Sequence, residues 1–229
     1  MSENQLQSSD PDDQAPVTHV LTREQRDVLK PDDVLKRLMD GNERFVSGSL
    51  TSRDHTRQVR DAAQGQSPMA VILSCLDSRI PVEDVFDQGI GDVFVGRVAG
   101  NFENTDLLGS MEFACLSQDI GGGGAKLIFV LGHEGCGAVK HAIDETDAGN
   151  ITAMLQNIRP AIGATVYDGE RKSDNDEFVN LVAETNVRLT VDRIRDRSQI
   201  LHDLEEQVTI KIVGGLYRME TGKVALITE

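Results

Sequence analysis

The chain is 229 residues long, which suits a single domain with a full buried core. Its formal net charge is −15, so it lacks the basic surface typical of proteins that bind nucleic acid. No apolar stretch approaches the roughly 20 residues of a membrane span, and the N-terminus has neither a basic nor an apolar signal region. The three cysteines do not form a disulfide pattern, which favours a cytoplasmic location.

The first part of the chain predicts an arm followed by two helices. Residues 1–20 are polar and acidic and predict a disordered N-terminal arm, which leaves residues 21–229 as one α/β domain. Thr22 and Gln25 have the spacing of a capping box, so a short helix is expected to begin after Thr22. Pro31 then predicts the start of a second helix.

Short apolar runs separated by helical patterns define the rest of the chain. Strands are expected at residues 69–73, 92–96, 126–131 and 208–213. Helical spacing lies between them, at residues 107–115 and over a long charged stretch, 176–207, that is expected to break near Ser198. This alternation predicts an α/β fold with a mostly parallel four-stranded sheet and helices on both of its faces.

The end of the chain predicts a hairpin. Residues 208–217 and 224–228 are two apolar runs that flank a turn, and Gly222 can supply the positive φ that such a turn needs. The last strand is therefore expected to be an antiparallel strand at the edge of the sheet.

Two short segments carry the residues of greatest chemical interest. Residues 74–79 read Ser-Cys-Leu-Asp-Ser-Arg, and residues 132–137 read Gly-His-Glu-Gly-Cys-Gly. Each segment directly follows a predicted strand. Because ligands of a parallel sheet bind beyond the carboxyl ends of its strands, the two segments are expected to meet in one crevice.

The residue types in these segments are typical of a zinc site. Cys75, His133 and Cys136 offer two thiolates and one imidazole, a soft ligand set that suits zinc. A structural zinc site fills all four positions with protein, whereas three ligands leave one position for water. Asp77 stands two residues after the first ligand, and Arg79 is placed to hold its carboxylate. The pattern predicts catalysis by a zinc-bound hydroxide.

Together, the two segments resemble the Cys-x-Asp-x-Arg and His-x-x-Cys motifs of the β-class carbonic anhydrases. Further segments that resemble this family are residues 41–45, 91–95, 97–101 and 213–217, so the resemblance covers about residues 25–229. The resemblance implies reversible hydration of carbon dioxide to bicarbonate and a proton. It also implies that Cys75, His133 and Cys136 are the Zn²⁺ ligands and that Asp77 and Arg79 are the catalytic pair.

The resemblance further assigns four residues to the substrate pocket. Gln66 matches a side chain that hydrogen-bonds substrate, and Gly137 would offer a backbone N–H to bicarbonate. Phe94 and Phe113 fall where the family places aromatic pocket walls, often from the neighbouring subunit, so a homodimer or homotetramer is expected. Two positions depart from the family pattern, since Phe113 stands where tyrosine is common and Val98 where asparagine is usual.

Other functions fit parts of the same pattern. A hydrolase for carbon disulfide or carbonyl sulfide could use this scaffold and this metal. A non-catalytic zinc-binding homologue would need no catalytic pair, and the presence of both Asp77 and Arg79 weighs against it. Finally, Cys136 could act as a metal-free nucleophile activated by His133.

The ligand set also leads to expectations about pH. Two thiolates offset the charge of zinc, so water is expected to ionise at a higher pH than at a three-histidine site, and activity should rise with pH as a single ionisation. Some members of the family close at low pH, when the aspartate leaves its arginine and moves to the metal. These members typically hold an inhibitory bicarbonate with a tryptophan, an arginine and a tyrosine. The chain has no tryptophan, so Asp77 is expected to stay with Arg79. His141 and His55 are the candidates for the proton shuttle.

Overall fold

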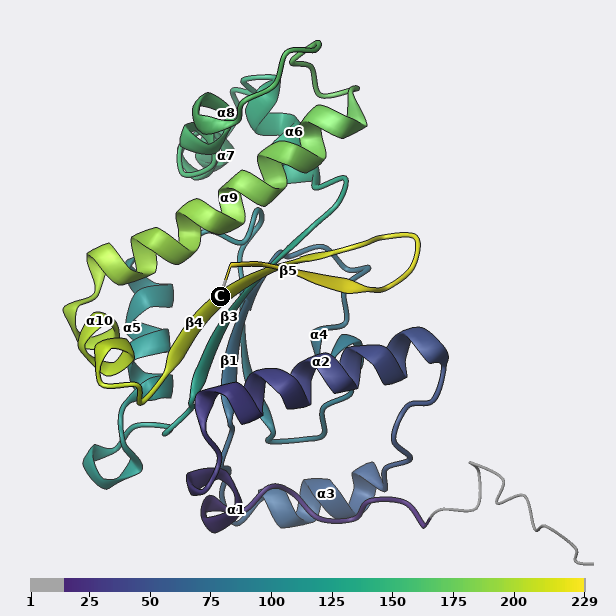
Figure 1. Ribbon diagram of the computed structural model, residues 1–229, viewed down its shortest axis with the longest axis vertical. Helices are drawn as coiled ribbons and strands as arrows, with labels where there is room; N and C mark the ends of the chain where they lie inside the picture. Colours follow the sequence, from purple (N-terminus) through teal and green to yellow (C-terminus); the bar gives the residue numbers. More distant parts are fainter. Residues whose placement is uncertain (1–14, 229) are drawn as a thin grey trace, which may run out of the picture.

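A five-stranded sheet in the order β2-β1-β3-β4-β5 forms the centre of the computed structural model, which describes residues 15–228 (Figure 1). The strands are β1 (Ala70–Ser74), β2 (Val93–Arg97), β3 (Leu127–His133), β4 (Lys211–Tyr217) and β5 (Val224–Thr228). The first four are parallel, and β5 runs antiparallel to β4 at the edge. This confirms the α/β class, the four parallel strands and the antiparallel edge strand.

The helices surround the sheet and also cover its carboxyl end. They are α1 (Arg23–Asp27), α2 (Pro31–Ser47), α3 (His55–Ala62), α4 (Val82–Val85), α5 (Thr105–Cys115), α6 (Gly137–Ile143), α7 (Gly149–Leu155), α8 (Arg159–Ala164), α9 (Asp176–Arg197) and α10 (Gln199–Glu206), with a 3₁₀ turn at Gln118–Ile120. Within residues 15–228, no helix combines the length and apolar character needed to cross a membrane.

Several helix boundaries follow from local signals in the sequence. The Thr22 side chain accepts a hydrogen bond from the Gln25 N–H, and the Gln25 side chain accepts from the Thr22 N–H, which confirms the capping box of α1. Pro31 opens α2 as expected. The long helical stretch breaks at Ser198, which ends α9 and whose hydroxyl accepts from the Leu201 N–H to cap α10.

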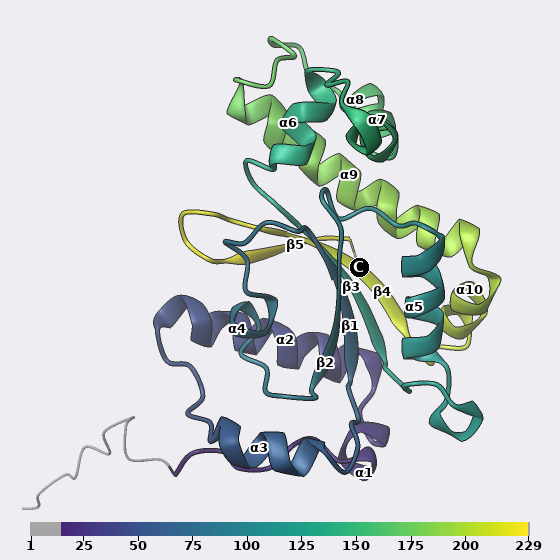
Figure 2. The same ribbon diagram turned by 180° about the vertical axis from the view of Figure 1, so that it is seen from behind.

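Strand β1 divides its side chains between two apolar cores. Ala70 and Ile72 pack with α2 and α4, whereas Val71 and Leu73 pack with α5, α9 and α10 on the opposite face (Figure 2). Both faces are therefore covered, which explains why the strand is an unbroken apolar run. Cys75 then leaves the strand and enters a third cluster, formed mainly by α6 to α9.

Strand β4 begins three residues later than the sequence predicted. The N–H groups of Val208 and Thr209 donate to the carbonyls of Glu205 and Leu204, so these residues still complete the last turn of α10. Val208 also has a positive φ of 56° and is 75% exposed, which places it outside a buried strand. The apolar character of residues 208–210 therefore did not mark a strand.

Only the end of the predicted N-terminal arm falls within the described residues. Residues 1–14 lie outside them. Val17 forms an isolated parallel bridge with Arg53, through hydrogen bonds to the backbone of Ser52 and Asp54.

A buried carboxylate joins α2 and the segment before α3 to the end of α4. The Asp87 side chain is fully buried. It accepts hydrogen bonds from Arg44 Nε at 2.5 Å, Arg53 Nη1 at 2.5 Å and Thr51 Oγ1 at 2.7 Å. Removing the carboxylate would leave a largely buried guanidinium, that of Arg53, without its counter-charge.

We expect Asp87→Ala to lower the free energy of unfolding by about 3 kcal/mol, the low end for breaking a buried ion pair, because Arg44 stays partly in water. Urea unfolding followed by circular dichroism would measure the change. Asp84→Ala, at an exposed position of α4, is the control and should change the midpoint little. Equal midpoints for the two variants would contradict the role of Asp87.

Candidate functional site

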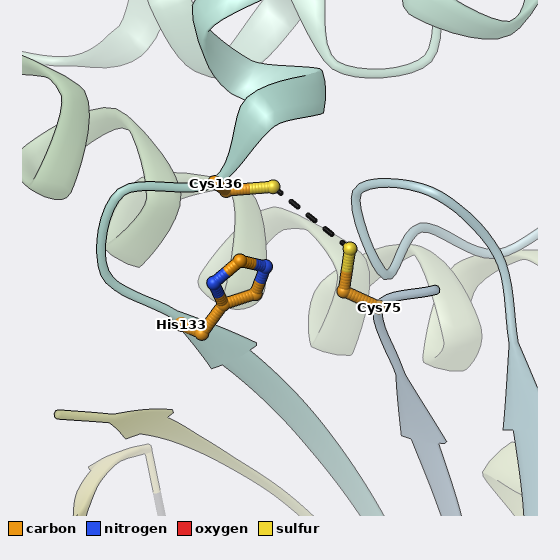
Figure 3. A group of neighbouring side chains, drawn as sticks. All are labelled: Cys75, His133 and Cys136. Carbon is orange, nitrogen blue, oxygen red and sulfur yellow. Dashed lines mark hydrogen bonds between the residues drawn. The ribbon is translucent and has the colours of Figure 1, made fainter. Parts of the chain in front are cut away.

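Three side chains that can bind a metal meet at the carboxyl ends of β1 and β3 (Figure 3). Cys75 directly follows β1, His133 ends β3, and Cys136 directly precedes α6. All three are buried, and their ligand atoms lie within 4.8 Å of one another. The structure thus brings the two motif segments together, as their positions after the strands predicted.

The histidine ring is oriented with one nitrogen toward the two sulfur atoms. His133 Nδ1 lies 2.9 Å from the Glu134 carbonyl oxygen, which can only accept, so Nδ1 carries the proton and Nε2 keeps its lone pair. Nε2 is buried and has no hydrogen-bond partner among the described residues. An unpaired nitrogen beside two thiols is the arrangement expected of a metal ligand whose other nitrogen is held by a carbonyl. The donor set therefore fits zinc.

The two cysteines of the site share one hydrogen bond. Their Sγ atoms are 4.0 Å apart. This bond is the largest cause that lowers the pKa of Cys75, to about 4, and it also raises the pKa of Cys136. The Gly100 N–H, 3.2 Å from Cys75 Sγ, further stabilises the Cys75 thiolate. In contrast, burial alone raises the pKa of Cys115 to about 12, because this cysteine lies in the apolar core away from the cluster.

A paired carboxylate faces the ligand cluster. Asp77 accepts hydrogen bonds from Arg79 Nη2 at 2.7 Å, Arg79 Nε at 2.9 Å and the Arg79 N–H at 3.0 Å. The side-chain bonds from Arg79 are the largest cause that lowers the pKa of Asp77, to about 2. Asp77 Oδ2 lies 3.9 Å from His133 Nε2. The carboxylate is thus ionised at neutral pH and directed at the ligand atoms.

Arg97, at the end of β2, fixes the main chain around this pair. Its Nη1 donates to the Cys75 carbonyl at 2.8 Å, and its Nη2 donates to the Ile80 carbonyl at 2.6 Å. These two carbonyls flank the segment that carries Asp77. The neighbouring Val98, which departs from the family pattern, packs against the apolar cores instead of joining a polar network.

Of the predicted pocket residues, only Gly137 lies beside the ligands of its own chain. It begins α6 directly after Cys136. Gln66 is exposed and precedes β1, and its carbonyl accepts a hydrogen bond from Gln118. It is therefore beyond the opposite end of the strand from Cys75, and the strand alone is roughly 17 Å long at about 3.3 Å per residue.

The two aromatic residues also lie away from the ligands. Phe94 and Phe113 line a cavity of about 280 Å³ between β2 and α5, together with Leu107 and Met111. Phe113 is 55% exposed. The register places Phe94 opposite Val71, four residues before Cys75 in the adjacent strand. Within one chain, Gln66 and the two phenylalanines are thus not part of the ligand cluster.

The two candidate shuttle histidines lie at different ends of the molecule. His141 is on α6, which follows Cys136, and its Nδ1 is 3.0 Å from Thr146 Oγ1. His55 begins α3, which Figure 1 shows at the opposite end of the sheet from α6. Only His141 is therefore on the side of the ligand cluster.

Comparison with known proteins agrees with this geometry. Residues 70–224 match the family model described as carbonic anhydrase. The chain belongs to the carbonic anhydrase family. Carbonic anhydrase 2 of Mycobacterium tuberculosis is 34% identical over 200 residues, which cover 83% of this chain and 90% of that protein.

Solved structures of β-carbonic anhydrases share the fold. One from the fungal pathogen Aspergillus fumigatus is 23% identical, with a TM-score of 0.66 over 86% of this chain and 93% of that one. A tetrameric one from Sordaria macrospora is 21% identical, with a TM-score of 0.61 over 73% of this chain and 84% of that one. The resemblance to the β-class carbonic anhydrases found in the sequence is confirmed.

Two asparagines of α9 contact main chain beside the ligands, and the sequence motifs did not identify them. Asn180 Oδ1 accepts from the Gly135 N–H at 2.8 Å, between His133 and Cys136. Asn186 Nδ2 donates to the Gly100 carbonyl at 2.8 Å. The available signal for Asn186 was a polar residue at an apolar position of a helical pattern, because it lies on the buried face of α9.

Proposed function

We propose that this β-carbonic anhydrase catalyses the reversible hydration of carbon dioxide to bicarbonate and a proton, with zinc held by Cys75, His133 and Cys136. The observation that carries the proposal is the ionised Asp77, held by Arg79 and directed at the buried ligand cluster. The relative from Mycobacterium tuberculosis is named carbonic anhydrase, which supports the same reaction.

The residues of the chain have distinct parts in this reaction. When bound, zinc would supply a Lewis acid that lowers the pKa of water toward neutrality. Because Asp77 stays ionised, it can only accept a hydrogen bond, so it would orient the attacking water with a lone pair toward the carbon of CO₂. Arg79 keeps the carboxylate in place with a two-pronged hydrogen bond. The Gly137 N–H would donate to an oxygen of bicarbonate.

Two other functions receive less support from the site. A nucleophilic Cys136 activated by His133 would need an accessible thiolate, but Cys136 is buried and its pKa is raised. A purely structural zinc site would need a fourth protein ligand in place of the Asp77–Arg79 pair.

The three cysteines are free, which supports the proposed cytoplasmic location.

Stopped-flow measurement of CO₂ hydration on protein of known metal content tests the proposed reaction. We expect hydration activity proportional to the zinc content, and no hydrolysis of carbon disulfide by the same sample. Zinc-loaded protein that hydrolyses carbon disulfide and leaves CO₂ unchanged would overturn the proposal in favour of the hydrolase.

We expect Cys75→Ser and His133→Ala to lose most of the bound zinc, because each removes one of only three protein ligands. Metal analysis after dialysis should give about one zinc per chain for the wild type. Cys115→Ser, which changes the cysteine outside the cluster, is the matched control and should keep its zinc. Full zinc retention in both ligand variants would refute the ligand assignment.

We expect Asp77→Asn and Arg79→Ala to keep zinc and to lower kcat by about 10²–10³, the typical effect of losing one preorganised contact. Stopped-flow kinetics and metal analysis on the same samples would separate catalysis from metal binding. Arg57→Ala is the control. It removes an exposed arginine of α3 that pairs with Asp54, far from the cluster, and should keep the wild-type rate. Wild-type kinetics in either variant of the pair would count against its catalytic role.

We propose that the active form contains at least two copies of the chain, joined at β2 and α5. Strand β2 is at the edge of the sheet, and all five of its residues are only half buried. Gln66, Phe94 and Phe113 lie on this side but away from their own ligand cluster, so a second copy is needed to bring them to a metal site. The relative from Sordaria macrospora is described as tetrameric.

We expect Ser110→Arg to shift the protein toward monomers and to lower the activity per chain, because it puts a charge beside the β2 and α5 cavity. Light scattering after size exclusion, combined with CO₂ hydration assays, would measure both effects. Thr56→Arg, at an exposed position on α3, is the control. A fully active monomer would rule out the shared pocket.

A further inference from the structure

A tight turn beyond β2 carries a hydrogen-bond donor to one of the metal ligands. The Gly100 N–H donates to Cys75 Sγ at 3.2 Å. Gly100 and Asn101 have consecutive positive φ values of 89° and 43°. The φ of 89° is one that residues with a side chain rarely adopt, and a Cβ atom at Gly100 would also lie 2.4 Å from Ile158 Cδ1, so this position favours glycine. The turn therefore brings a backbone amide close to the sulfur, on a residue with little intrinsic conformational restraint.

A buried asparagine on α9 holds this glycine from its other side. Asn186 is 1% exposed, and its Nδ2 donates to the Gly100 carbonyl at 2.8 Å. Its Oδ1 is buried and has no hydrogen-bond partner among the residues that the structure describes. Burying an amide without full pairing is unfavourable. Asn186 is therefore poorly explained by helix stability, and its one side-chain bond is directed at the turn that contacts Cys75.

We propose that Asn186 is a positioning residue for the metal site, which acts through Gly100 on Cys75. The bond from Asn186 anchors the peptide group that follows Gly100, which limits how this group can rotate relative to the peptide that precedes it. The preceding peptide contains the N–H that points at Cys75 Sγ. A fixed donor at that sulfur holds the cysteine in its ligating orientation and withdraws charge from the metal–sulfur bond. The inference rests on the proposed metal site.

A purely structural role for Asn186 has a different signature. If the side chain only joined α9 to the turn, its removal would lower the stability of the whole protein and leave the environment of the bound metal unchanged. Thr190 offers a matched control, since it is also fully buried on α9 with an Oγ1 that lacks a partner within the described residues. Replacing it perturbs the same helix without contact to Gly100.

The test uses full-length protein loaded with Co²⁺, whose charge-transfer absorption reports on the cobalt–thiolate bonds. Asn186→Leu removes the donor at similar size, Asn186→Ser is too short to reach Gly100, and Thr190→Val is the control. Both Asn186 variants should shift the charge-transfer band and release metal to a chelator about 10–100-fold faster than wild type, as is usual for loss of an outer-shell contact. Thr190→Val should match wild type in both measurements.

A second measurement tests the hydrogen bond from Gly100 to Cys75 directly in the wild-type protein. In wild-type protein loaded with ¹¹³Cd, the Gly100 amide proton should show scalar coupling to the metal through its hydrogen bond to Cys75 Sγ. This coupling should weaken or vanish in both Asn186 variants and persist in Thr190→Val. If a variant does not fold, the coupling in wild type still tests the donor, and the other variant tests the anchor.

The outcomes separate this inference from the proposed function. Wild-type spectra and release rates in both Asn186 variants, or no coupling at Gly100 in wild type, would overturn the positioning role while CO₂ hydration by wild type stands. Wild-type protein that binds no metal would overturn the proposed function itself.

Discussion

The pairing of β1 with β3 is the constraint on which the site depends. These strands are parallel neighbours, and Ser74 stands opposite Leu131 in their register. Cys75 and His133 follow almost side by side, because each comes within two residues of that pair. A shift by one residue would turn the side chains of one strand to the other face and separate the ligands. Alternate residues of β1 pack into two different cores, so a slip would require both cores to repack, and the packing that stabilises the sheet also holds the ligands in place.

The sequence predicted the part of the site whose residues directly follow a strand, namely the metal ligands. Cys75 and Cys136 lie in short segments that follow unbroken apolar runs, so a single rule about parallel sheets placed them together. The fold was equally accessible, since alternating strand and helix patterns determine the class and Ser198 marked the break between two helices. Local patterns were insufficient at β4, where an apolar stretch remains in the turn after α10.

Contacts that depend on long-range packing could not be derived from the sequence. The bond from Asn186 to Gly100 joins residues 86 positions apart, and no motif links them. Gln66 and Phe113 lie away from the ligand cluster of their own chain, and the second copy proposed to bring them to a metal site cannot be placed from a single sequence. Neither kind of contact joins residues that are near each other in the sequence. They depend on how α9 and the sheet edge meet their neighbours.

The edge of β2 affects how much correctly assembled protein forms after synthesis. A strand edge with free N–H and C=O groups is a template for pairing with other chains, correct or not. In the proposed dimer, a single chain released after synthesis would present this edge until a second copy covered it, and the rate of that step would rise with the concentration of folded chains. Misassembly and correct assembly then compete for the same hydrogen-bonding groups. The yield of intact protein should therefore depend on how quickly folded partners meet, in addition to the stability of each chain.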